Sequence, residues 1–379
     1  MTNPAQQETR EGLWPDEPRR GGGRKRRGSG LFGVRRFAGN GRGEESMVPE
    51  AEFTSYYGRP IVKPAPWSDE IPAYLFVGGL AAGSSLLAAG ADLADLPGLR
   101  RQARWTALGS IGLATYFLIA DLGRPERFIN MLRVVKLTSP MSVGSWILAG
   151  YGPLAGVAAV AELARPVEEA LPQSLKPVAR LLGWAGRPAG LGAAFFSPPL
   201  AAYTAVLLGN TATPAWHSAY KELPMVFAGS AAASAAGMAM IAAPHEQAWP
   251  AGRLAVGGAL WELGSAQVME HSMGISAELL HEGEAGRWWT ASKALTLGGA
   301  AVSLVAGRRS KPAAVVAGAA LVAGSICTRF AIFRAGIASA KDPKYTVVPQ
   351  RERLNARRAA EAAAGQAPTG EASPPKENR

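Results

Sequence analysis

Apolar residues in this chain form long, nearly uninterrupted stretches that lie between two polar tails. A helix needs about 20 mostly apolar residues to cross the hydrocarbon core of a membrane, and roughly eight stretches reach that length. None of them alternates between polar and apolar positions as the strands of a membrane barrel do. The stretches cover roughly residues 71–92, 103–123, 142–163, 189–208, 223–243, 251–270, 288–306 and 313–335. The pattern predicts an all-α integral membrane protein with eight transmembrane helices in a bundle.

This pattern divides the chain into a basic, disordered N-terminal tail (1–49), a juxtamembrane segment (50–69), a transmembrane domain (70–336) and a polar, largely disordered C-terminal tail (337–379). An even number of spans places both termini on one side of the membrane, which we call the terminal face. The other side is the opposite face. Basic residues in the short loops favour the opposite face as the cytoplasmic one, whereas the basic N-terminal tail favours the terminal face. The sequence leaves the orientation open.

The net charge of +11 raises the question of nucleic-acid binding. Much of this charge lies in the Gly-rich segment 21–43, which has seven basic residues and no acidic one. Such a segment has too few apolar residues to form a core. Next to a membrane domain it is expected to contact anionic lipid headgroups rather than nucleic acid.

The chain has few of the cysteine and histidine side chains that bind metals and haem. Cys327 is the single cysteine, so the chain cannot hold an iron–sulfur cluster of its own, which needs several thiolates. The four histidines lie in predicted loops or at a helix end, whereas a membrane haem needs axial histidines within its helices. We expect a chain without haem, iron–sulfur cluster or metal site.

Polar residues gather near the ends of the spans on the terminal face. Glu70 enters the first span, Glu222 enters the fifth, and Tyr203 lies near the end of the fourth. The second span ends in "ADLGRPERFINMLR", which brings Asp121 and Arg124 to the same face. Each alone is explained by a helix cap or an interfacial anchor, but together they indicate a site on this face. Burial disfavours the ionised form of a carboxylate, so Asp121 is a candidate proton acceptor or donor, with Arg124 as its counter-charge.

Glu262 differs from these residues because it lies in the middle of the sixth span. Acidic residues at that depth are costly and are functional candidates by default. Glu262 is a candidate relay for protons across the membrane. The alternative is a protonated side chain that bonds to a neighbouring helix.

Four segments resemble the membrane subunits of the NrfD type, the group that includes the polysulfide reductase anchor. They read "PAYLFVGGLAAGSSLLA" (72–88), "DLGRPERFINMLRVVKLTSPMSVGSWIL" (121–148), "YTAVLLGNTATPAWH" (203–217) and "ELPMVFAGSAAASA" (222–235). Each is weak alone, and together they are specific. The similarity covers about residues 50–345, with the long basic N-terminus outside it.

This resemblance implies a haem-free, quinone-reactive anchor that is not catalytic on its own, in a multi-pass arrangement in a bacterial plasma membrane. Such a subunit exchanges electrons between menaquinone or ubiquinone and a ferredoxin-like iron–sulfur subunit with four clusters. That subunit in turn meets a molybdopterin catalytic subunit, as in formate dehydrogenase or polysulfide reductase. In the family the quinone pocket lies among the first four helices, on the face that docks the iron–sulfur subunit.

Some functional residues of the family have matches in this chain. Tyr203 matches the helix-four tyrosine that is associated with a hydrogen bond to the quinone. Asp121 and Arg124 match the recurrent "DLGRP" element. Polysulfide reductase relatives use an Asn/His pair near the start of helix one, where this chain instead reads "WSDEIPAY". The predicted quinone-binding residues are Trp67, Glu70, Tyr74, Asp121, Arg124 and Tyr203, and the predicted proton-transfer residues are Asp121, Glu222 and Glu262.

Two other classes of function stay open at this point. In a secondary transporter or a proton-translocating subunit without quinone chemistry, Glu262 and Lys293 would line a pathway. Broken helices are common in transporters, and "FFSPPLAAY" predicts such a break. The third class is a purely structural anchor. Bound menaquinone would separate the quinone-reactive subunit from both.

Overall fold

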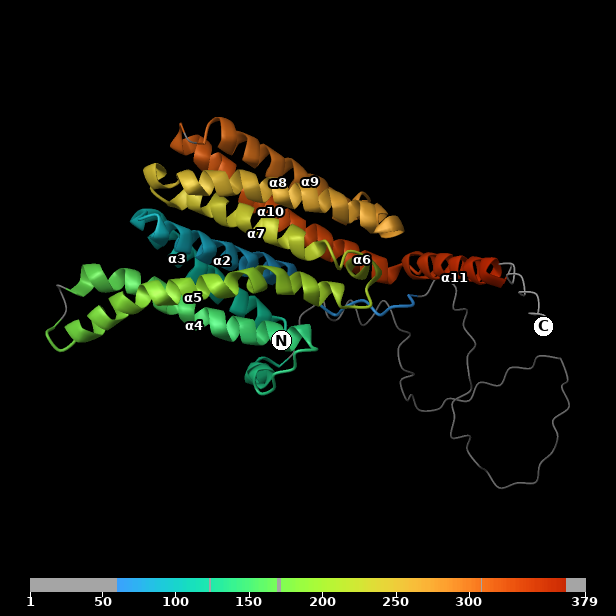
Figure 1. The fold of residues 1–379 in the computed structure, drawn as a ribbon, viewed down its shortest axis with the longest axis horizontal. Coiled ribbons are helices and arrows are strands. Elements are labelled where there is room, and N and C mark those ends of the chain that lie inside the picture. Colours follow the sequence, from blue (N-terminus) through green and yellow to red (C-terminus); the bar gives the residue numbers. More distant parts are fainter. Residues whose placement is uncertain (1–59, 123, 169–171, 308, 366–379) are drawn as a thin grey trace, which may run out of the picture. The chain divides into compact units, whose positions relative to one another are not determined.

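The computed structural model describes residues 60–122, 124–168, 172–307 and 309–365. The predictions for the tail 1–49, for residues 50–59 and for the end of the chain after residue 365 lie outside this range. Nine helices of 20 or more residues are described, with shorter helical segments between them (Figure 1). The long helices are α2 (Glu70–Leu93), α3 (Pro97–Ala120), α4 (Pro140–Glu168), α5 (Lys176–Gly209), α7 (Leu223–Ala242), α8 (Trp249–Ser272), α9 (Gly283–Val305), α10 (Lys311–Lys341) and α11 (Lys344–Gly365).

Each of the eight predicted stretches forms a helix in the structure, and the described residues contain no strand. Five helices are long and apolar enough to cross a membrane: α2, α4, α5, α7 and α10. A sixth span is counted if α3 and the short helix η1 (Pro125–Leu132) are taken together as one broken span. Helices α8 and α9 each carry at least three ionisable residues, which lowers their mean hydropathy. The chain is therefore an all-helical, multi-pass membrane protein, and the count of eight spans remains a prediction.

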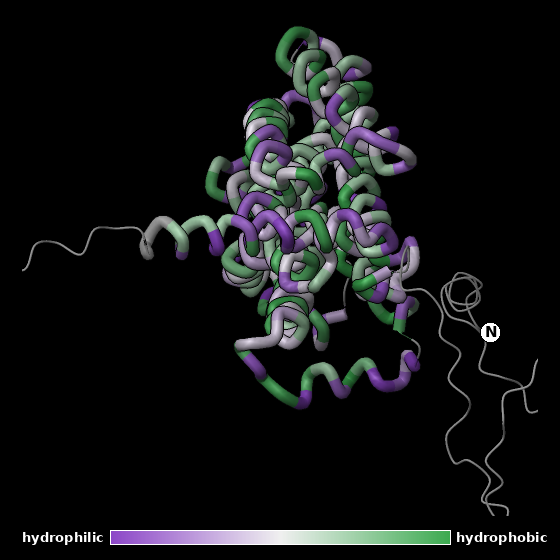
Figure 2. The backbone as a smooth tube through the Cα atoms, turned by 90° about the vertical axis from the view of Figure 1, so that its right-hand side faces the viewer, coloured by the Kyte–Doolittle hydropathy of each residue, from purple (hydrophilic) through white to green (hydrophobic). Residues whose placement is uncertain are grey.

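Helices α2 to α5 and α7 to α10 run side by side, whereas α11 extends from the end of α10, and α2 packs against α3, α5, α7 and α10 (Figure 1). Helices α4 and α5 pair with each other on one side of α2, whereas α8 and α9 pack against α7 and α10 on the other. In the end-on view of Figure 2, hydrophilic segments mark the connections among the mostly hydrophobic turns of the helices. Large apolar side chains such as Leu113, Phe195 and Leu260 point outward and are mostly exposed. An apolar outer surface of this kind fits a lipid environment.

The start of α2 and the end of α10 lie at the same end of the bundle, because Arg334 Nη2 donates to both carboxylate oxygens of Asp69 at 2.7 and 2.9 Å. We call this end the terminal end, and it corresponds to the predicted terminal face. Asp121, at the end of α3, lies there too.

Two expectations from the sequence differ from the structure. The described part of the tail that was expected to be disordered, residues 337–365, is mostly helical, because α10 continues to Lys341 and α11 covers Lys344–Gly365. The segment "RERLNARRAAEAAA" explains this helix, because it is made almost entirely of strong helix formers. The break predicted at "FFSPPLAAY" is absent, since α5 runs through Pro198 and Pro199. Prolines are tolerated within membrane helices. The hydroxyl of Ser197, directly before the proline pair, donates to the carbonyl of Ala193 at 2.9 Å, one turn earlier in the same helix.

Candidate functional site

A cavity of about 200 Å³ opens between α2, α3, α4 and α5 at the terminal end of the bundle. Its walls are mostly apolar, with a few polar groups that come from different helices. The polar or aromatic lining residues are Trp67, Tyr74, Asp121, Ser145 and Tyr203, and the apolar ones include Ile71, Leu75, Leu118, Leu148 and Leu207. An apolar pocket with a few convergent polar groups is the usual form of a small-molecule site.

Tyr203 lies on α5 less than two turns before the helix ends, and it is 8% exposed. Its hydroxyl is buried and has no hydrogen-bond partner among the described residues. The ring fits against α4 because Gly144 has no side chain, and a Cβ at that position would overlap the ring. A buried tyrosine hydroxyl normally finds a partner, so Tyr203 is a candidate hydrogen-bond donor to a molecule in this cavity.

Asp121 follows the last residue of α3 and also lines the cavity. Its Oδ1 accepts a hydrogen bond from the Ser68 hydroxyl at 2.7 Å and lies 3.4 Å from the Ser68 backbone nitrogen. The expected counter-charge is wrong: Arg124 is exposed, and none of the ion pairs found among the described residues joins it to Asp121. The chain turns into η1 directly after Arg124, which leaves this side chain outside the cavity. A neutral hydroxyl therefore holds the carboxylate in place of the expected arginine.

Of the other predicted residues on the terminal face, two line the cavity and two do not. Trp67 and Tyr74, two of the predicted quinone-binding residues, line the cavity. Trp67 stacks on the buried Trp216, with ring centroids 5.6 Å apart. Glu70 is half-buried at the first position of α2, and it is not among the residues that line the cavity. Glu222 is likewise half-buried, at the N-cap of α7 and outside the cavity.

Sequence reasoning missed three residues that shape this site: Ser68, Gly144 and Trp216. Ser68 and Trp216 lie in segments that drew attention for other residues, namely "WSDEIPAY" and "TATPAWH". Gly144 also lies in a quoted segment, the one that covers residues 121–148, but nothing in that segment distinguishes it from the other glycines of the chain. No cluster of three or more His, Cys, Asp or Glu side chains that could hold a metal ion occurs among the residues that the structure describes.

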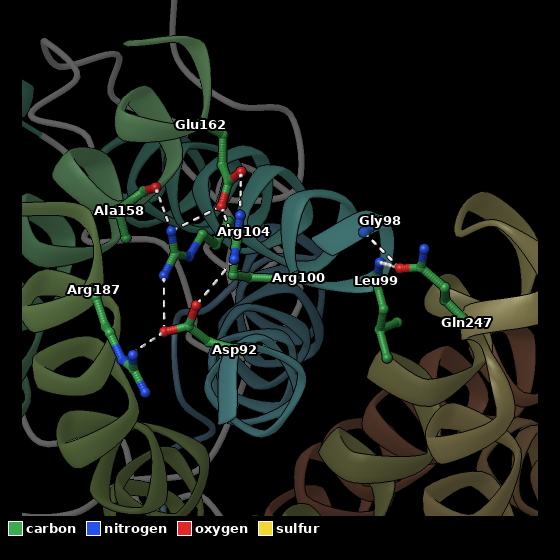
Figure 3. A network of polar contacts seen from close by, with 9 residues as sticks. All are labelled: Asp92, Gly98, Leu99, Arg100, Arg104, Ala158, Glu162, Arg187 and Gln247. Atoms are coloured by element: carbon green, nitrogen blue, oxygen red, sulfur yellow. Dashed lines mark hydrogen bonds and ion pairs between the residues drawn. The ribbon is translucent and has the colours of Figure 1, made fainter. Parts of the chain in front are cut away.

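A network of ionic contacts joins the same four helices at the other end of the bundle (Figure 3). Glu162 on α4 forms ion pairs with two arginines of α3. Its Oε1 lies 2.7 Å from Arg100 Nε and 2.8 Å from Arg104 Nη1. Asp92 on α2 lies 3.1 Å from Arg100 and 3.5 Å from Arg187 of α5. Arg104 is almost fully buried, and its guanidinium fits beside Gly190, where a Cβ would come within 2.9 Å of Nη2. This network fixes the helices that enclose the cavity.

Residues 61–249 match the model of the family described as polysulphide reductase, NrfD. These residues belong to the NrfD family. The matched part includes every residue that lines the cavity, whereas most of α8 and all of α9 and α10 lie beyond it. Members of the NrfD family are membrane subunits of oxidoreductase complexes, and they assemble with iron–sulfur and molybdopterin subunits. A comparison with curated proteins gives no match.

Proposed function

We propose that this chain is a haem-free quinone-reactive membrane subunit with eight spans. It exchanges electrons between menaquinone or ubiquinone and an iron–sulfur partner, which serves a molybdopterin enzyme of the formate dehydrogenase or polysulfide reductase kind. The observation that carries the proposal is the unpaired hydroxyl of Tyr203 inside an apolar cavity. The family assignment favours this function over the secondary transporter considered from the sequence.

The cavity suits a quinone headgroup in size and chemistry. An apolar cavity of roughly 150 Å³ holds one benzene ring, so about 200 Å³ admits one substituted ring while an isoprenoid tail must extend outside. Quinones carry two carbonyl acceptors, and the Tyr203 hydroxyl is a donor without a partner. Trp67, Ile71 and Leu75 offer flat or apolar surfaces to the ring.

Asp121 is the residue of this site that can move a proton. A quinone that takes up two electrons also takes up two protons, and its product releases them again. The Asp121 carboxylate lies at the cavity wall, and Ser68 holds it in place through the hydroxyl bond of 2.7 Å. A carboxylate held next to the reacting carbonyl is suited to general acid–base work.

The segment that follows Asp121 in the chain offers a basic surface to the iron–sulfur partner. Arg124, Arg127, Arg133 and Lys136 are all exposed along η1 and the loop that follows it. A cluster of four positive charges beside the cavity fits an acidic surface on the partner and would steer it to this end of the bundle.

The direct test is to purify the full chain and measure menaquinone and ubiquinone by mass spectrometry after solvent extraction. The proposal expects quinone in near-stoichiometric amount in the wild type and less in Tyr203→Phe. Tyr116→Phe is the matched control, because Tyr116 is 65% exposed on α3 and is not among the residues that line the cavity. Equal quinone content in all three proteins, or none in the wild type even after added quinone, would contradict the proposal.

A further inference from the structure

The walls of the cavity differ in how well they are covered. Most of the lining residues on α2 and α5 are buried, namely Ile71, Tyr74, Leu75, Tyr203 and Leu208. On the side of α3 and α4 most lining residues are only half-buried, namely Leu118, Asp121, Leu122 and Leu148. Met141, in the first turn of α4, lines the cavity and is 52% exposed. The cavity is therefore closed by α2 and α5 and open to the outer surface between α3 and α4.

The space behind α2 is filled by buried groups of the other helices. The carbonyl of Leu75, whose side chain lines the cavity, lies 3.5 Å from Nε of the fully buried Arg329 on α10. Glu262, the predicted proton relay, lies in the same half of the bundle on α8. It is 3% exposed, its Oε1 accepts from the Thr328 hydroxyl at 2.6 Å, and it is not among the residues that line the cavity. A ligand that came from this side would have to displace buried charged groups.

Helix α3 shows where the opening begins. Its buried face repeats every three or four residues and consists of Leu99, Ala103, Arg104, Ala107, Ser110, Ile111 and Ala114. The same face continues four and seven residues later at Leu118 and Asp121, which line the cavity, but no residue from 115 to 122 is buried. Among the described residues, the hydrogen bonds that join α3 to α4 all come from Arg100 and Arg104, at the other end of the bundle. The two helices are thus tied together at that end and frame an opening at the terminal end.

The short helix η1 borders this opening with its apolar face. A 3₁₀ helix has three residues per turn, so residues three apart lie on the same face. Phe128 and Met131 share a half-buried face, and Met131 lines the cavity. Arg127, Asn130 and Arg133 share a face that is exposed. The apolar face of η1 therefore meets the cavity, and its charged face remains available to the iron–sulfur partner.

The loop after η1 is fixed to α4 beside the opening. The Val134 carbonyl accepts from the Ser142 hydroxyl at 3.0 Å, and the same hydroxyl oxygen accepts from the Lys136 backbone nitrogen at 3.0 Å. Val134, Val135 and Leu137 are mostly exposed. Exposed apolar side chains next to basic ones are typical of a segment at the membrane interface. The opening therefore lies at the edge of the hydrocarbon layer, next to lipid.

We propose that a lipid quinone enters the cavity sideways from the membrane, through the opening between the terminal ends of α3 and α4. The inference rests on the proposed function, because about 200 Å³ holds the headgroup and leaves the isoprenoid tail outside. The tail leaves through this opening, where Met131 and Met141 contact its first isoprenoid unit. Methionine is unbranched and flexible, which suits a chain that has to slide past it. The ligand of the site is thus a quinone with an apolar tail rather than a water-soluble one.

The test compares a menaquinone with menadione, which is the same headgroup without the tail. Both are titrated against the full chain in lipid nanodiscs. Met141→Trp should obstruct the tail and lower the affinity for menaquinone about tenfold, as expected for lost contact with about two CH₂ groups, while the affinity for menadione changes by less than about twofold. Met225→Trp is the matched control and should change neither affinity, because Met225 is 50% exposed near the start of α7 and is not among the residues that line the cavity.

A second measurement locates the tail directly. A menaquinone that carries a diazirine on its first isoprenoid unit is bound to the wild type and irradiated, and the labelled peptides are identified by mass spectrometry. The label should fall at the end of α3, in η1 or on the first turns of α4, with Met131 and Met141 among the labelled residues. A label that falls mainly on any other helix would overturn the proposed route.

The two proposals fail in different ways. If neither quinone binds to the wild type, the proposed function is wrong and the route falls with it. If both bind, but Met141→Trp lowers the two affinities equally or lowers neither, only the route is wrong. Should Met141→Trp fail to fold, the position of the label decides.

Discussion

Replacement of Tyr203 by phenylalanine separates a ligand-binding role from a structural one. The substitution removes one hydroxyl and keeps the ring that packs against Gly144. A neutral hydrogen bond contributes about 0.5–1.5 kcal/mol, which corresponds to a loss of quinone affinity of about three- to tenfold. In the protein without quinone the hydroxyl has no described partner, so its removal breaks no protein hydrogen bond. We therefore expect weaker quinone binding with no loss of thermal stability in the quinone-free protein.

Both quantities can be measured on the same preparations. Quenching of tryptophan fluorescence reports quinone binding, because Trp67 lines the cavity, and thermal unfolding in detergent reports stability before and after quinone is added. Quinone should raise the unfolding temperature of the wild type more than that of Tyr203→Phe. If Tyr203→Phe instead destabilises the quinone-free protein and binds quinone as tightly as the wild type, the hydroxyl has a structural partner and the assignment of the site is wrong.

Four further outcomes follow from the structure. Gly144→Ala should push the Tyr203 ring into the cavity, lower stability by about 1–3 kcal/mol and weaken quinone binding more than Tyr203→Phe does, as quinone titration can measure. Asp121→Asn should preserve quinone affinity and lower the turnover of the assembled complex, since it keeps shape and removes the titrating group. Glu162→Gln should lower the free energy of unfolding by about 3–5 kcal/mol, because it leaves Arg104 and Arg100 undercompensated, with the affinity for quinone unchanged. The purified chain should show no haem or iron–sulfur absorption, and a b-type band in protein without partners would refute this.

The helical architecture was predictable because membranes impose a simple rule on sequence. Every backbone group must be satisfied within the segment, so long apolar stretches become helices, as all eight did here. The two differences have other causes. A proline pair need not end a membrane helix, as α5 shows, and an Ala-rich polar segment such as α11 is helical because its residues favour helix without being apolar. Hydropathy detects neither effect.

The site was predictable only where a polar residue stands alone in an apolar setting. Tyr203 and Asp121 drew attention for that reason, and the structure places both at one cavity together with Trp67. The partner of Asp121 was mispredicted because sequence proximity favoured Arg124, three residues away, over Ser68, which is 53 residues away. Which of two polar residues meets a carboxylate depends on how the chain turns after the helix, and no local pattern encodes that turn.

Glycines also place the aromatic residues of this site, and their role follows from shape rather than from chemistry. Gly144 leaves room for the ring of Tyr203, and Gly336 on α10 leaves room for Trp216, since a Cβ at either position would overlap the ring. Trp216 is fixed further by a bond of 2.8 Å from its Nε1 to the Ile332 carbonyl, and it stacks in turn on Trp67 at the cavity. Small residues serve general close packing in membrane helices, so a glycine that supports a site looks the same in sequence as one that only brings helices together. The distinction appears only when the side chain that occupies the space beside the glycine is known. Gly144 and Gly336 are therefore as much a part of the proposed quinone site as the aromatic rings for which they leave room.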